Sequence, residues 1–309
     1  MALDVRPIIP SRFFGHKTRG AAPSSRIGAY IALMKLRVVE LLLVTTIPTM
    51  VLAEGGWPSI QLMAVTLIGG TLAAGGANAI NMYIDRDIDK LMVRTQNRPL
   101  VTGALTPRAA MIFAIALEFV AFLVLWAGAN LLAAVLAVSA TLFYVFVYSL
   151  WLKRTSKQNI VIGGAAGAMP VLVGWAAVTN SLGWAPVVLF VVIFLWTPPH
   201  FWALAIRHAD DYKAAGVPMM PVVVSLERTV RSMTTYAVLL TLSTLVLVPV
   251  AELGWIYGIT ALVFGVAFVI GSIRLGSDPS PKRSMRLFTF SITYVTAVFV
   301  ALTVDVLLQ

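Results

Sequence analysis

The sequence predicts an all-α integral membrane protein, folded as one bundle of about nine transmembrane helices. Of its 309 residues, 59% are hydrophobic and only 12% are charged, whereas a soluble domain carries about 25% charged residues. The apolar residues gather in nine runs, each close to the ~20 residues that a helix needs to cross hydrocarbon. Because lipid cannot satisfy free backbone polar groups, these runs are expected to be helices.

The expected spans are assigned by hydropathy and by the breaks between them. In chain order they are residues 28–52, 58–82, 108–127, 130–150, 159–179, 184–205, 230–251, 254–273 and 286–307. Residues 1–27 are basic and lack the continuous apolar core of a secretory signal. They are expected to form a cytoplasmic tail, with a short mitochondrial transit segment as the alternative. Residues 28–309 then form one transmembrane domain, whose long loops near 83–107 and 206–229 are expected to be functional.

The basic residues fix an expected orientation. When the spans are threaded alternately, all 23 Lys and Arg residues fall in the N-terminal region or in the connections after the second, fourth, sixth and eighth spans. The positive-inside rule then places the N-terminus in the cytoplasm, or matrix, and the C-terminus outside. The net charge of +10 therefore reflects topology and anionic lipid, and no nucleic-acid partner is expected. The chain has no cysteine, which excludes disulfides and thiolate chemistry.

A polar stripe follows the second span. Asn81, Asp85 and Asp89 are spaced i, i+4, i+8, so they share one face of a helix, and Asn78 lies near the same stripe. Carboxylate oxygens suit Mg²⁺ shared with substrate phosphates, and the arginines that follow suit phosphate contact. The alternative is a solvated helix end with ion pairs Arg86–Asp89 and Asp87–Lys90. The asparagines within an apolar span favour a functional site.

A second cluster follows the sixth span. The prolines Pro198 and Pro199 are expected to kink that helix, and Arg207 and Asp211 lie one turn apart beyond them. The alternative is a simple Arg207–Asp211 helix pair. His200 is either a hydrogen-bonded structural residue or a ligand. Two acids inside predicted spans, Glu40 and Glu118, are open to both a pocket role and a packing role.

Three stretches carry a resemblance to a known family: Asn78–Leu100, Tyr148–Trp175 and Trp196–Val222. They resemble the UbiA superfamily of membrane prenyltransferases over most of the chain from about residue 28. The blocks D-R-D-I-D, N-I-V-I-G-G and W-T-P-P-H-F-W are similar to those of its protohaem IX farnesyltransferase branch. The resemblance implies transfer of the farnesyl group of farnesyl diphosphate to a vinyl group of haem b, with addition of water. It also implies Mg²⁺ as cofactor, a bacterial inner membrane rather than a mitochondrial one, and haem A synthase or oxidase assembly factors as downstream partners.

The resemblance also implies roles for individual residues. Asn81, Asp85 and Asp89 match the first superfamily motif and would hold Mg²⁺-diphosphate, while Asp211 matches the last acid of the second motif. The first position of that motif is Arg207, which cannot bind a metal, so fewer ions or a direct arginine–phosphate contact are expected. The aromatics Tyr83, Trp196 and Trp202 would stabilise a farnesyl cation, and His200 or His208 would contact haem. The full set of remaining substrate-binding candidates is Asn78, Arg94, Arg98, Lys153, Arg154, Arg207, Lys213, His200, His208, Tyr83 and Trp202.

Rival functions remain at this point. Within the same enzyme class, the alternative is prenylation of another aromatic or tetrapyrrole acceptor. A secondary transporter would carry charges deep within spans facing both sides, and a non-catalytic haem-handling protein would not need the acidic stripe.

Overall fold

The computed structural model describes residues 25–278 and 280–309, with the side chains of residues 37–43 left out. Within this part of the chain every regular element is a helix. Eight helices are long and apolar enough to cross a membrane. They are α3 (Ile60–Ile84), α5 (Pro107–Gly128), α6 with its continuation (Leu131–Thr155), α8 (Asn159–Thr179), α9 (Trp184–Arg207), α12 (Leu226–Val250), α13 (Trp255–Ser277) and α14 (Pro281–Leu308).

The expected first span differs from the structure. Lys35 adopts a left-handed conformation, with φ 52° and ψ 52°, and divides this region into α1 (Arg26–Met34) and α2 (Leu36–Glu54). A left-handed residue cannot continue an α-helix, so α1 turns away from the line of α2. The predicted count of nine spans is therefore not confirmed, although α2 packs against α8 and α14 within the bundle. Glu40 falls among the side chains that the structure does not describe.

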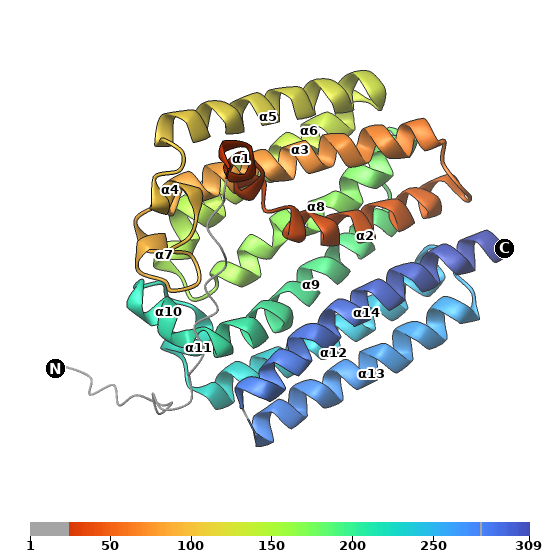
Figure 1. Ribbon diagram of the computed structural model, residues 1–309. Coiled ribbons are helices and arrows are strands. Elements are labelled where there is room, and N and C mark those ends of the chain that lie inside the picture. The colour runs from red at the N-terminus through yellow and green to blue at the C-terminus, as the bar shows by residue number, and fades with distance from the viewer. Residues whose placement is uncertain (1–24, 279) are drawn as a thin grey trace.

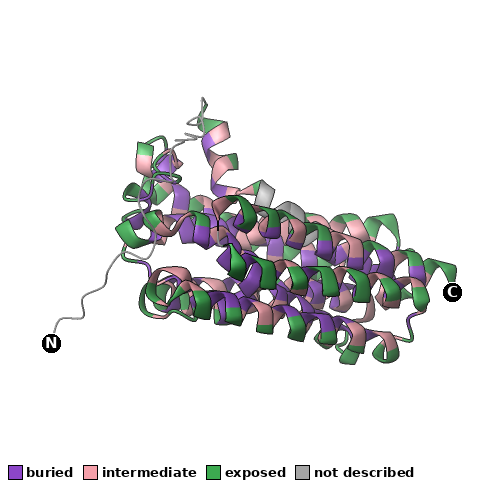
Figure 2. Cartoon of the chain, turned by 90° about the horizontal axis from the view of Figure 1, so that it is seen from below, coloured by how far each residue is buried: buried purple, intermediate pink, exposed green. Residues whose placement is uncertain are grey.

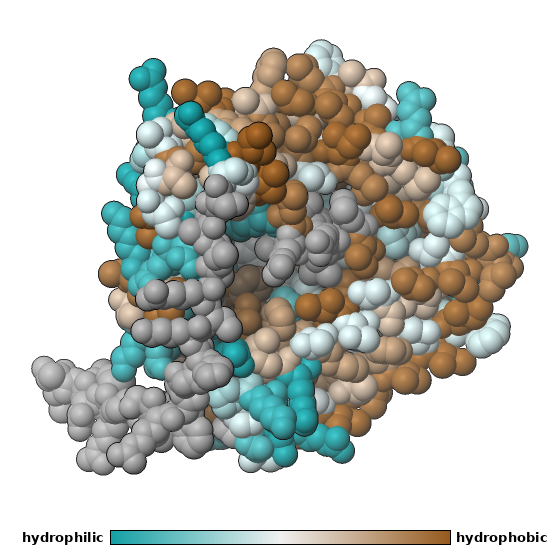
Figure 3. Space-filling model, in the orientation of Figure 1, coloured by the Kyte–Doolittle hydropathy of each residue, from teal (hydrophilic) through white to brown (hydrophobic). Residues whose placement is uncertain are grey.

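The bundle has two chemically different ends. The short helices α4 (Pro99–Thr102), α7 (Lys153–Thr155), α10 (Ala209–Ala214) and α11 (Met220–Val223) gather at one end, and the C-terminus lies at the other (Figure 1). Buried residues fill the interior between the long helices, and exposed residues point outward (Figure 2). Hydrophobic side chains cover much of the outer surface, whereas hydrophilic ones gather mostly at the end with the short helices (Figure 3). That distribution fits a protein whose sides face lipid.

The fourth span changes its helical geometry as it approaches this polar end. The α6 segment Leu131–Leu142 passes into a π-helix, η3 (Phe143–Leu152), before α7. The backbone N–H of Lys153 bonds the carbonyls of Trp151 and Tyr148. A π-helix closes i→i+5 hydrogen bonds and is wider than an α-helix, and such segments are frequent at functional sites. Here it stacks the rings of Tyr144 and Tyr148, whose centroids lie 5.3 Å apart.

Small residues let the helices beside the site approach closely. A Cβ added at Gly76 of α3 would lie 2.6 Å from a carboxyl oxygen of Glu118 on α5. Glu118 in turn accepts a hydrogen bond from Thr141 of α6 at 3.1 Å. Glu118 therefore links three helices, which agrees with the packing alternative for this residue. The two prolines of the sixth span, Pro198 and Pro199, are buried inside α9, which stays one helix through Arg207.

Candidate functional site

The site is built where α3 ends. Ile84 is the last residue of α3, Asp85 caps its C-terminus, and Asp89 lies in the following 3₁₀ turn η2 (Ile88–Lys90). The backbone N–H of Asp89 bonds the carbonyl of Asp85 at 2.9 Å, which extends the helical path by one turn. The Asp85 and Asp89 side chains are 0% and 1% exposed. The predicted stripe therefore forms, but its last member stands outside the helix.

Buried carboxylates need positive partners, because an unpaired charge inside a protein costs several kcal/mol. Asp85 pairs with Lys153, and Asp89 pairs with Arg98 at 2.6 Å. Asn81 donates to Asp85 at 2.9 Å and accepts from Lys35 at 3.1 Å. The left-handed turn at Lys35 thus brings a second lysine to the stripe.

The outer acid of the segment makes a different pair. Arg154 binds both carboxylate oxygens of Asp87 at 2.7 Å, and this hydrogen bonding lowers the pKa of Asp87. The helix-end pairs Arg86–Asp89 and Asp87–Lys90 are thus replaced by longer-range ones, from Arg98 to Asp89 and from Arg154 to Asp87. This replacement argues against a solvated helix end.

Each buried acid keeps one oxygen that accepts no hydrogen bond, and Nη2 of Arg154 lies 3.9 Å from that oxygen of Asp85. Oδ1 of Asp85 and Oδ1 of Asp89 are buried without a hydrogen-bond partner. Such atoms are rare in folded proteins and call for an explanation. Hard carboxylate oxygens are the donors that Mg²⁺ prefers, so this donor set fits a divalent cation. Over the described residues, no three His, Cys, Asp or Glu side chains converge.

The second long loop packs onto the first. Asp211 accepts a hydrogen bond from the backbone N–H of Val93 at 3.1 Å, and Arg94 donates to the hydroxyl of Tyr212 at 3.2 Å. Asp211 therefore holds the loop that follows Asp89, and a direct metal role for it stays a prediction.

The remaining charged candidates of this loop lie outward. Arg207 and Lys213 are exposed. His208 lies 4.0 Å from Asp211, and partial burial, with the charge of Arg94, lowers the pKa of His208.

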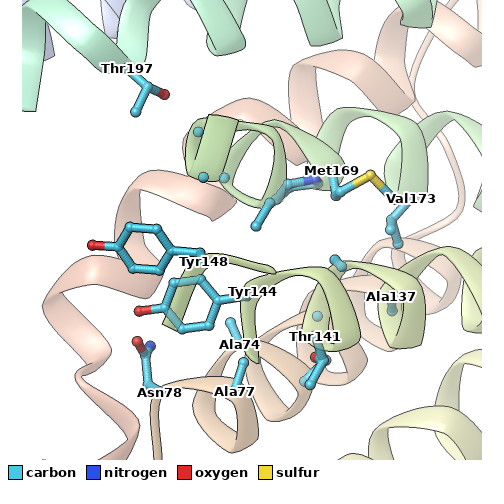
Figure 4. Close-up of a pocket in the computed structure, with 18 of the residues that line it drawn as sticks. Ala74, Ala77, Asn78, Ala137, Thr141, Tyr144, Tyr148, Met169, Val173 and Thr197 are labelled. Carbon is cyan, nitrogen blue, oxygen red and sulfur yellow. The ribbon is translucent and has the colours of Figure 1, made fainter. Parts of the chain in front are cut away.

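An apolar cavity of about 260 Å³ lies between α3, α6, η3, α8 and α9. Tyr144, Tyr148 and Asn78 lie at one end of it, and Met169 and Val173 toward the other (Figure 4). Asn78 also lies one turn before Asn81 on α3, so the polar end of the cavity adjoins the acidic stripe. The arrangement offers an anion-and-metal site joined to a hydrophobic chamber.

The predicted aromatic and histidine candidates lie in different places. Tyr83 stacks with Arg86, whose guanidinium is 4.4 Å from the ring centre. Trp202 is 1% exposed and packs against Tyr236 of α12. His200 is stacked between two other rings and its Nδ1 lies 2.6 Å from the hydroxyl of Ser291, as its structural alternative describes; haem contact by His200 or His208 stays a prediction.

Four residues of the site are missing from the sequence-based set. The contact of Lys35 with Asn81 depends on the break between α1 and α2. Ser149 accepts a hydrogen bond from Asn81 at 2.9 Å. Tyr144 and Tyr148 line the cavity. Their i, i+4 spacing in the fourth span was the available signal, since it places two aromatic rings on one face.

Comparison with known proteins agrees with this geometry. The sequence pattern of the UbiA prenyltransferase family matches residues 42–296. The chain belongs to this family. A protohaem IX farnesyltransferase of Frankia casuarinae is 53% identical over 290 residues, covering 92% of this chain and 99% of that protein. Another, of Pseudarthrobacter chlorophenolicus, is 49% identical over 294 residues, covering 94% and 92%.

Solved structures support the UbiA fold. A digeranylgeranylglyceryl phosphate synthase superimposes with a TM-score of 0.76 at 18% identity, covering 92% of this chain and 99% of that one. A UbiA homologue from Archaeoglobus fulgidus, bound to DMAPP and Mg²⁺, has a TM-score of 0.62 at 18% identity, covering 89% and 99%. The family match and the relatives make the protein an integral membrane enzyme of the prenyltransferase class.

Proposed function

We propose that this protein transfers the farnesyl group of farnesyl diphosphate to a vinyl group of haem b, with addition of water, to give haem O and diphosphate. The observation that carries the proposal is the buried pair Asp85 and Asp89, each with an oxygen that accepts no hydrogen bond, next to an apolar cavity. The relatives at about 50% identity over nearly the whole chain, named protohaem IX farnesyltransferases, support the choice of substrates.

The residues divide the work between the two ends of the substrate. Breaking the allylic C–O bond leaves negative charge on diphosphate and positive charge on farnesyl C1. Lys153, Arg98 and Lys35 surround the acidic stripe and are placed to bind diphosphate oxygens. The stacked rings of Tyr144 and Tyr148 line the adjoining cavity and are suited to stabilise the allylic cation.

The bond-forming steps conserve atoms and charge. The terminal vinyl carbon joins farnesyl C1, which leaves a cation on the vinyl carbon next to the porphyrin. Water adds to that carbon and loses a proton, and the hydroxyl remains. The apolar cavity keeps water from capturing the farnesyl cation before the vinyl group does.

Asp85 and Asp89, with Asn81 and water, are the residues that would hold Mg²⁺. The bound ion would neutralise diphosphate charge as the leaving group departs. Asp211 is proposed to act through the loop of Val93 that it holds. With Arg207, an exposed residue, in place of an acid in the second motif, the proposed site has its metal on the first loop.

The geometry of the site bears differently on each alternative function. The acidic site lies at one end of the bundle, where a transporter would need access from both sides. A haem-handling protein would leave unexplained the oxygens of Asp85 and Asp89 that accept no hydrogen bond. Another prenyl acceptor remains an outcome of the assay below.

The proposed setting is the inner membrane of a bacterium, with residues 1–27 as a cytoplasmic tail and 28–309 as the prenyltransferase domain. The loops near 83–107 and 206–229 then face the cytoplasm, from which a diphosphate headgroup arrives while its tail remains in lipid. Haem A synthase or oxidase assembly factors would receive the product.

A direct assay tests the function. Purified protein in lipid nanodiscs is incubated with farnesyl diphosphate, MgCl₂ and haem b, and the product is identified by mass. We expect haem heavier by one farnesyl group and one hydroxyl group. Prenylation of another acceptor, with haem b unchanged, would replace the proposed substrate; absence of any prenyl transfer would overturn the function.

Variants of the acids test the site. Asp85→Ala and the isosteric Asp85→Asn are expected to lower turnover at least about a hundredfold, because the metal and its charge stabilisation are lost. The matched control is Asp87→Asn. The side chain of Asp87 is 61% exposed and pairs with Arg154, and this variant should keep most activity. Full activity of folded Asp85→Asn would contradict the assignment.

A further inference from the structure

The cavity wall contains glycines of two physically different kinds. Gly163 and Gly164 of α8 are packed against neighbours: a Cβ at Gly163 would collide with the ring of Tyr148, and one at Gly164 would lie 3.0 Å from the side chain of Thr197. Helix packing is therefore sufficient to explain glycine at these two positions.

Gly70 of α3 and Gly167 of α8 are not explained in this way. Both line the cavity, yet a Cβ at either would meet no atom within 4 Å. Glycine inside a helix is less stable than alanine by roughly 0.5–1 kcal/mol. Neither residue has a left-handed backbone, since positive φ among the glycines is confined to Gly55, Gly103 and Gly216 over the described chain. What the missing side chains leave is open volume within the cavity.

The position of this volume follows from helical rise. Gly70 precedes Asn78 by eight residues, or about 12 Å along α3. Asn78, Tyr144 and Tyr148 lie at the end of the cavity next to the acidic stripe (Figure 4). Gly70 therefore lies well away from the diphosphate end, beside the path of a chain that begins there. Gly167 lies one helical turn beyond Gly163 on α8, at an intermediate depth.

We propose that Gly70 and Gly167 set the length of the prenyl chain that the enzyme accepts. Gly167 leaves room for the middle of the chain, and Gly70 leaves room for its last isoprene unit. Val173 of α8, which lines the end of the cavity opposite Asn78, limits longer chains. This inference rests on the proposed function, because it takes a prenyl diphosphate as the occupant of the cavity.

Binding measurements test the inference without requiring haem. The dissociation constants of geranyl, farnesyl and geranylgeranyl diphosphate are measured by calorimetry on purified protein in nanodiscs with Mg²⁺. Gly70→Leu is expected to weaken the binding of farnesyl and geranylgeranyl diphosphate at least tenfold, and the binding of geranyl diphosphate less than threefold. Gly167→Leu, closer to the diphosphate end, is expected to weaken all three.

The matched control is Gly258→Leu, a helical glycine of α13 outside the cavity where a Cβ makes only an ordinary contact at 3.8 Å. It should change none of the three constants. A Gly70→Leu protein that loses affinity equally for every chain, or for none, would overturn the proposal.

A variant that binds one compound more tightly gives a test that misfolding cannot mimic. Val173→Ala lengthens the cavity. It is expected to strengthen the binding of geranylgeranyl diphosphate at least threefold and to leave the binding of geranyl diphosphate unchanged. No gain for the longer chain would count against the assigned depth. If the native protein binds none of the three compounds, the proposed function fails as well; if it binds them and only the chain-length effects are absent, this inference alone fails.

Discussion

At the scale of single residues, the site is a set of buried acids held in place by cations. Lys153 contacts Asp85 and Arg98 contacts Asp89, so both carboxylates are neutralised before any ion or substrate binds. The same two cations are the proposed partners of diphosphate. Substrate and metal would therefore enter by exchange: the cations pass to phosphate oxygens as a divalent ion takes the carboxylates. This keeps the buried charge balanced throughout.

Replacement of Lys153 tests the exchange. Lys153→Met leaves Asp85 buried without its main partner, which costs about 3–5 kcal/mol in comparable sites. We expect a lower melting temperature in metal-free buffer, and a larger rise on addition of Mn²⁺ than the native protein shows. Mn²⁺ binding measured by electron paramagnetic resonance should tighten, while binding of inorganic diphosphate should weaken.

The control for that variant is Lys157→Met, because Lys157 is exposed in the connection before α8. It should alter neither the melting temperature nor Mn²⁺ affinity. If Lys153→Met binds Mn²⁺ no better than the native protein, the lysine does not compete with the ion.

The sequence alone was sufficient to predict the stripe of Asn81, Asp85 and Asp89, because helical spacing is a local property. It was not sufficient to predict the partners. Lys35 reaches Asn81 only because its left-handed backbone conformation separates α1 from α2. Asp211 was expected beside a metal by analogy, and it holds the backbone of Val93. Such contacts join residues separated by 46 and 118 positions, and no local pattern encodes them.

At the scale of elements, hydropathy placed eight spans to within a few residues but could not show how each begins or bends. The π-helix of the fourth span, Phe143–Leu152, has the composition of any apolar helix. The i, i+4 spacing of Tyr144 and Tyr148 indicates a shared face, but the widening that stacks their rings is not evident from sequence. Helices α12 and α14 begin four or five residues earlier than expected, at Leu226 and Pro281, because serine caps there outweigh the basic residues of their first turns.

One cap at the opposite end offers a test of element stability. Asp305 of α14 is 3% exposed and accepts hydrogen bonds from the backbone N–H groups of Gly254 and Tyr257, at the start of α13. Asp305→Ala leaves these N–H groups buried and is expected to destabilise the fold by about 1–2 kcal/mol. The measurement is the thermal unfolding midpoint in a fixed detergent.

Glu227→Ala is the control, because the side chain of Glu227 is 83% exposed and pairs with Arg231 on the surface, where such pairs contribute little. Farnesyl diphosphate binding should be unchanged in both variants, since α13 begins at the end remote from the acidic stripe. A midpoint for Asp305→Ala equal to that of Glu227→Ala would show that the cap contributes no net stability.

At the scale of the whole molecule, charge and chemistry lie at the same end. The turns at residues 55–59, 129–130, 180–183 and 251–254 contain no Lys or Arg, while Arg98 and Lys153 contact the acidic stripe at the end where the short helices gather (Figure 1). If the basic residues orient the protein as the positive-inside rule predicts, the same one-sided distribution of Lys and Arg serves both insertion and the proposed binding of diphosphate.

Labelling of introduced cysteines tests this orientation, and the absence of native cysteine makes each variant a single-site probe. Lys157→Cys and Ser181→Cys lie exposed just before and just after α8, whose 21 residues span about 31 Å. In intact spheroplasts, a membrane-impermeant maleimide is expected to label Ser181→Cys and to spare Lys157→Cys. After permeabilisation both should react. The reverse pattern in intact cells would place the acidic site outside the cytoplasm and would remove the proposed route by which the diphosphate headgroup reaches it.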